Sequence, residues 1–86
     1  MNLSLVTPEA VEFHGEVTSV IAPGTEGYLG VLPGHTPLVT SLRPGKLSVD
    51  SAAGRRDFEI GAGYMEVTPE SVIIITEKVT SKTGEA

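Results

Sequence analysis

The chain has 86 residues, no cysteine, no tryptophan and a formal net charge of −5 at pH 7. Its length corresponds to one domain, and the lack of cysteine excludes disulfides and thiolate zinc sites. The acidic balance disfavours a nucleic-acid partner, and the longest apolar run, residues 72–75, is far shorter than the roughly 20 residues of a bilayer-spanning helix.

Short apolar runs between turn residues predict strands along the whole chain. No stretch keeps the apolar spacing of three and four residues that a helix needs over about 10–12 residues. Strands are expected, in chain order, over residues 2–7, 11–13, 16–22, 28–32, 38–42, 46–50, 57–60, 64–68 and 72–76. Short strands at such intervals are typical of an all-β sandwich or barrel.

Alternation of apolar and polar residues predicts which side chains enter the core. The expected inward residues are Leu3, Leu5, Leu47, Val49, Phe58 and Ile60. Ser48 is expected to face water because it lies between two inward positions. The run over 72–76 lacks alternation and is expected to be buried on both faces.

Glycine and proline mark the expected turns. Pro-Gly pairs at residues 23–24, 33–34 and 44–45 combine a fixed proline φ with a glycine that can take positive φ. Gly15 is expected to form a bulge or kink between the strands over residues 11–13 and 16–22. Residues 51–54 turn the chain between the strands of the clearest hairpin.

Motifs of enzyme chemistry are missing from the chain. It contains no nucleophile elbow, phosphate loop or complete dinucleotide fingerprint, and its two histidines are not spaced as metal ligands. No cofactor or metal is therefore expected. His35 lies in a loop between Pro33 and Pro37, where either a bond to its own backbone or a contact with a partner is a reasonable role.

Residues 24–38, which read GTEGYLGVLPGHTPL, resemble the signature of the ε subunit of F-type ATP synthases. The similarity extends over about residues 3 to 79. It implies an all-β, flattened β-sandwich of about ten short strands. On this basis residues 1–79 form the family's N-terminal β-sandwich domain, and residues 80–86 form a polar, flexible tail.

The resemblance also implies a role without an active site. The family's sandwich is a non-catalytic rotor subunit that links the γ subunit of the central stalk to the membrane c-ring, so that proton-driven rotation is coupled to ATP synthesis. The expected partners are γ and the c-ring, without a small-molecule substrate or a membrane span of its own. The implied location is the cytoplasmic face of the bacterial inner membrane, as a peripheral part of the synthase.

Two sets of partner-binding residues follow from matching positions in the family. The c-ring foot comprises Glu26, Gly27, Tyr28, Leu29 and Gly30, with Tyr28 expected at the tip. The γ side comprises His35, Thr36, Leu38 and Thr40. A basic patch at Arg43 and Lys46 is a further candidate contact, although no motif ties it to a partner.

Relatives usually continue into a C-terminal helical hairpin that can inhibit ATP hydrolysis and sometimes binds ATP. Because the chain ends at Ala86, where that hairpin would begin, neither property is expected of it. Two other functions stay open from the residues alone. One is a free-standing small β-sandwich that binds proteins, and the other is a small hydrolase that uses His35.

Overall fold

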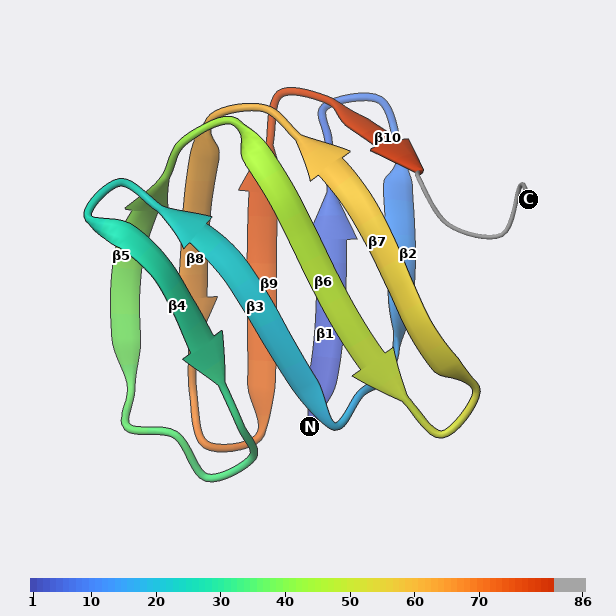
Figure 1. Cartoon of the computed structure of the whole chain (residues 1–86), viewed down its shortest axis with the longest axis vertical. Helices are drawn as coiled ribbons and strands as arrows, with labels where there is room; N and C mark the ends of the chain where they lie inside the picture. Colours follow the sequence, from blue (N-terminus) through green and yellow to red (C-terminus); the bar gives the residue numbers. More distant parts are fainter. Residues whose placement is uncertain (82–86) are drawn as a thin grey trace.

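A computed structural model describes residues 1–81, which form ten strands and no helix (Figure 1). The strands are β1 (Asn2–Val6), β2 (Val11–Glu16), β3 (Ser19–Gly24), β4 (Gly27–Val31), β5 (Leu38–Leu42), β6 (Gly45–Ser51), β7 (Gly54–Ile60), β8 (Gly63–Val67), β9 (Ser71–Thr76) and β10 (Val79–Ser81). This architecture confirms the expected all-β sandwich of about ten short strands.

The strands form two facing layers (Figure 1). Layer A consists of β5, β8, β9, β1 and β2 in that order, and layer B consists of β4, β3, β6, β7 and β10. The layers join where β3 meets β5, at the pair Gly24 and Leu42. All paired strands are antiparallel except β1 and β9, which run parallel.

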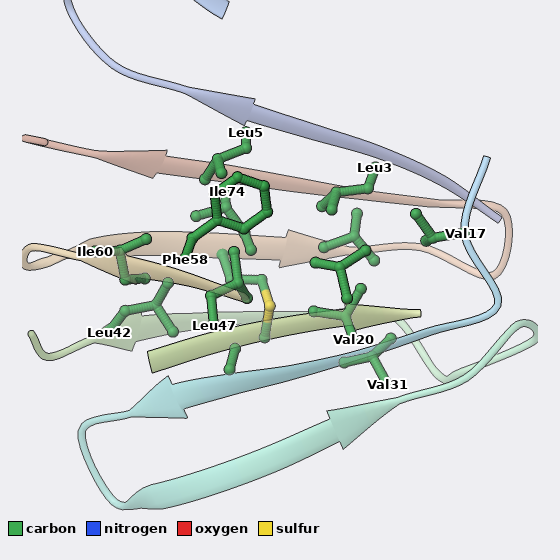
Figure 2. Packing of buried hydrophobic residues seen from close by; sticks show 14 of the residues in the cluster. Leu3, Leu5, Val17, Val20, Val31, Leu42, Leu47, Phe58, Ile60 and Ile74 are labelled. Carbon is green, nitrogen blue, oxygen red and sulfur yellow. The ribbon is translucent and has the colours of Figure 1, made fainter. Parts of the chain in front are cut away.

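The core lies between the two layers and follows the alternation of the strands (Figure 2). All six residues predicted to point inward are at most 2% exposed. The core also contains Val17, Val20, Ala22, Val31, Leu42, Met65, Val67, Val72 and Ile74.

Two local predictions about glycine are wrong. Gly15 does not interrupt its strand, because it pairs with Leu3 and β2 continues to Glu16. Residues 23–24 are not a turn but the end of β3, where they pair with Tyr28 and Gly27. The turn lies at residues 25–26, and Gly27 takes a φ of 130°. In both places ladder pairing outweighs the local preference of the glycine.

Two burial predictions also differ from the structure. Strand β9 is buried on one face only, because Ile73 is 39% exposed and Ile75 is 54% exposed on the outer side of layer A. Ser48 is buried at 7% exposure, in register with Ile21 of β3 and Asp57 of β7.

The last described strand extends slightly beyond the predicted domain boundary. Thr80 and Ser81 belong to β10 and pair with Glu59 and Phe58 of β7. The remainder of the predicted tail, residues 82–86, lies outside the described residues.

Candidate functional site

The predicted c-ring foot lies on the β3–β4 hairpin. Its turn is formed by Thr25 and Glu26, so Tyr28 lies within β4 rather than at the tip. Tyr28 is 55% exposed, and its hydroxyl accepts a hydrogen bond of 3.2 Å from the Lys46 backbone N–H. The ring is therefore fixed against the start of β6.

The remaining foot residues differ in their exposure. Glu26 and Gly30 are exposed, whereas Leu29 is half-buried and packs against the core. The basic patch lies next to this hairpin, because the Arg43 backbone N–H donates a hydrogen bond of 2.9 Å to the carbonyl of Pro23 in β3. The exposed groups at this end thus include an acid, a tyrosine and two cations.

The His35 loop lies at the opposite end of the molecule, between β4 and β5 (Figure 1). His35 Nδ1–H donates to the Thr36 carbonyl at 2.7 Å, and the Gly34 N–H donates to the Pro69 carbonyl at 2.9 Å. Gly34 has a φ of 86°, which glycine adopts without steric cost. His35 therefore makes the backbone bond that was one of its two predicted roles.

The predicted γ-side residues of β5 do not point outward. Leu38 and Thr40 are half-buried and alternate with the buried Leu42 on the inner side of the strand. The residue between them, Val39, points away from the core and is 70% exposed. Val39 was not among the residues predicted for the site.

An exposed apolar surface covers the outer side of layer A. This surface, termed the apolar face, consists of Val39, Tyr64, Ile73 and Ile75, which are between 39% and 70% exposed. Tyr64 pairs with Ile75 across β8 and β9, and Ile75 pairs with Val6 of β1. In the sequence this face corresponds to the apolar run over residues 72–76, which was predicted to be buried on both faces.

The outer side of layer B is more polar. Arg55 Nε and Nη2 donate to the two carboxylate oxygens of Asp50 at 3.0 and 3.2 Å, and Ser19 Oγ donates to the same carboxylate at 3.1 Å. The bonds from Arg55 and Ser19 lower the pKa of Asp50, and the bond to Asp50 raises the pKa of Arg55. Lys46 and Glu59 pair in register farther along the same two strands, away from their connecting turn.

Residues 1–81 enclose no pocket and hold no cluster of three His, Asp or Glu side chains that could bind a metal ion. No helix long and apolar enough to cross a membrane occurs in this part of the chain. The exposed features of this range are the apolar face, the β3–β4 hairpin and the His35 loop.

Comparison with known proteins identifies relatives of one kind. A family model described as "ATP synthase, Delta/Epsilon chain, beta-sandwich domain" matches residues 1–82. The ATP synthase epsilon chain of Caulobacter vibrioides is 46% identical over 77 residues, which cover 90% of each chain. The epsilon chain of Brucella anthropi is 40% identical over 77 residues, covering 88% of this chain and 57% of that protein.

Solved structures agree with this assignment. A chain of the Euglena gracilis mitochondrial ATP synthase superposes with a TM-score of 0.85 at 29% identity, covering 92% of this chain and 51% of that one. A chain of the Tetrahymena thermophila mitochondrial ATP synthase has a TM-score of 0.78 at 19% identity, covering 92% and 64%, and supports the fold alone.

These relatives confirm the resemblance found in the sequence and indicate a non-catalytic subunit of the complex. The match extends over nearly the whole chain, although the chain spans only 57% of the Brucella protein. The chain belongs to the family of ATP synthase delta and epsilon chains, whose β-sandwich domain its residues 1–82 match.

Proposed function

We propose that the chain is a rotor subunit of an F-type ATP synthase and joins the γ subunit of the central stalk to the membrane c-ring. In this role it performs no chemistry and transmits torque between the two partners. The similarity to a chain of the Euglena gracilis OSCP/F1/c-ring assembly supports this role. The proposed location is peripheral, on the cytoplasmic face of a bacterial inner membrane.

The apolar face is the observation that carries this proposal. Val39, Tyr64 and Ile75 are each more than half exposed, yet they lie side by side on adjacent strands. Clustered exposed apolar side chains usually mark a protein interface, because covering them removes apolar surface from water. The γ subunit is the proposed partner for this face, and His35 and Thr36, in the loop that leads into β5, are proposed to join the contact.

The β3–β4 hairpin is the proposed contact with the c-ring. Its turn residue Glu26 and the exposed ring of Tyr28 lie at the end of the sandwich away from His35. Tyr28 is held by Lys46, and a tyrosine fixed before binding loses little conformational entropy when it is covered.

A binding experiment tests the proposal directly. The full chain is immobilised and mixed with a γ–c-ring rotor complex prepared without its epsilon chain. The proposal predicts a stable complex that survives washing. A free-standing protein-binding module, the alternative function, would retain neither γ nor the c-ring under the same conditions.

A further inference from the structure

One charged side chain lies within the otherwise uncharged centre of layer A. Strands β5, β8, β9 and β1 read LVTSL, GYMEV, SVIIIT and NLSLV, so Glu66 of β8 is their single ionisable acid or base apart from tyrosine. Glu66 pairs with Val39 on one side and with Ile73 on the other. The carboxylate therefore lies at the centre of the apolar face.

The neighbours of Glu66 are all parts of that face. Residues directly opposite one another in a sheet have Cβ atoms about 4.5–5.5 Å apart, so Val39 and Ile73 flank the carboxylate on both sides. Tyr64 lies two residues earlier on the same side of β8. Glu66 itself is exposed and forms no ion pair with any other of residues 1–81.

Covering this face places a strong constraint on the partner. In the free chain water solvates the carboxylate, but a partner that covers Val39, Tyr64 and Ile73 removes that water. An ionised carboxylate without a counter-charge is costly to bury, whereas one paired with a cation and hydrogen-bonded is tolerated. A second copy of the face supplies no cation and would bring two carboxylates together.

We infer that Glu66 determines the specificity of the apolar face, and that the rotor surface covering it is apolar with an Arg or Lys side chain opposite Glu66. The apolar side chains supply contact area, and the carboxylate rejects apolar surfaces that lack a matching cation. This inference rests on the proposed function, because it takes the rotor as the partner.

Three variants of the full chain test the inference against the same rotor complex. Glu66→Gln removes the charge with little change of shape, and Glu66→Leu makes the face wholly apolar. Glu59→Gln is the matched control, because Glu59 is an exposed glutamate on β7 of layer B. Circular dichroism and thermal unfolding check that each variant folds. If Glu66→Leu does not fold, the binding of Glu66→Gln decides the test alone.

The sign of the change in affinity decides the outcome. With a cation in the partner, Glu66→Gln and Glu66→Leu each weaken binding about tenfold or more, because both leave that cation covered and unpaired. Glu59→Gln binds like the unaltered chain. Against a purely apolar partner surface, Glu66→Leu binds as tightly as the unaltered chain or more tightly, which would overturn the inference.

The two proposals fail in different ways. If the unaltered chain does not bind the rotor complex, the proposed function is wrong and the inference falls with it. If the unaltered chain binds and the Glu66 variants bind equally well, the inference alone is wrong.

Discussion

Asp50 forms the best-defined ion pair on layer B. Arg55 reaches both carboxylate oxygens, and Ser19 adds a third hydrogen bond. Such two-point pairs fix geometry better than single contacts, and here the pair ties β6 to β7 near their connecting turn. Because both groups are exposed, the pair adds only modestly to stability.

The lowered pKa of Asp50 predicts how stability depends on pH. A carboxylate with a folded-state pKa below the ordinary value of 3.8 stabilises the fold above that value and loses its contribution as the pH falls through the folded-state pKa. Urea unfolding of the chain and of Asp50→Asn should show a difference near neutral pH that vanishes well below 3.8. A difference that stays constant across this range would contradict the assignment.

Gly63 is predicted to be irreplaceable for steric reasons. A Cβ at this position would lie 2.8 Å from Thr76 Cα and closer still to the Ile75 carbonyl, both backbone atoms of β9. Gly63→Ala should therefore lower the free energy of unfolding by about 3 kcal/mol, measured by urea denaturation.

Gly30→Ala is the control for that substitution. Nothing lies within 4 Å of the Cβ that it would add, so the expected change in stability is small. Equal effects of the two substitutions would show that β8 and β9 can separate without cost.

At the scale of elements, the sandwich is open between β2 and β7. Strand β2 pairs with β1 only, and β10 covers β7 only from Phe58 to Ile60. The Phe13 and Phe58 rings pack edge to face across this opening, with their centroids 6.0 Å apart. The Arg56 guanidinium lies 5.3 Å from the Phe13 ring centre and 5.0 Å from the Phe58 ring centre.

Arg56 is predicted to stabilise the packing of β2 against β7 across this opening. Arg56→Ala removes both cation–π contacts and the apolar stem, so the free energy of unfolding should fall by about 1 kcal/mol. Arg56→Lys should recover part of that loss. Equal midpoints of urea unfolding for the Ala variant and the unaltered chain would contradict this role.

Sequence alternation predicted the inner faces of the strands but not the environment of the outer faces. Leu3, Leu5, Phe58 and Ile60 are inward because a period of two fixes the side of each residue. The continuous apolar run of β9 is compatible with a covering layer or with an exposed contact surface. Only the order of strands shows that layer A has no cover within residues 1–81.

The sequence predicted the loops of the candidate site better than it predicted the outward-facing residues of the strands. The signature placed Tyr28 at the tip of its loop, whereas Tyr28 lies within β4 next to the turn. It assigned His35 to the γ side, and the residues alone left a backbone bond and a partner contact as alternatives. The signature did not reveal that Thr40 faces inward, because a motif carries no information on strand parity. Val39 and Ile75 become neighbours of Tyr64 and Glu66 only through pairing between distant parts of the chain.

At the scale of the whole molecule, the two outer sides differ in character, and matched substitutions can compare them. Ile73 on layer A and Ile21 on layer B are both 39% exposed. Ile73→Ser and Ile21→Ser should have similar effects on thermal unfolding, since the two side chains are equally exposed. Only Ile73→Ser should weaken binding to γ, by about tenfold. Equal loss of binding in both variants would contradict one-sided docking.

The central claim is that the outer side of layer A binds the rotor, and thiol protection tests it most directly. Because the chain has no cysteine, single variants Val39→Cys and Glu59→Cys each report on one position. When the γ–c-ring complex is added, the account predicts that labelling slows strongly at position 39 and stays unchanged at position 59. Binding accompanied by protection at position 59 and free labelling at position 39 would contradict it.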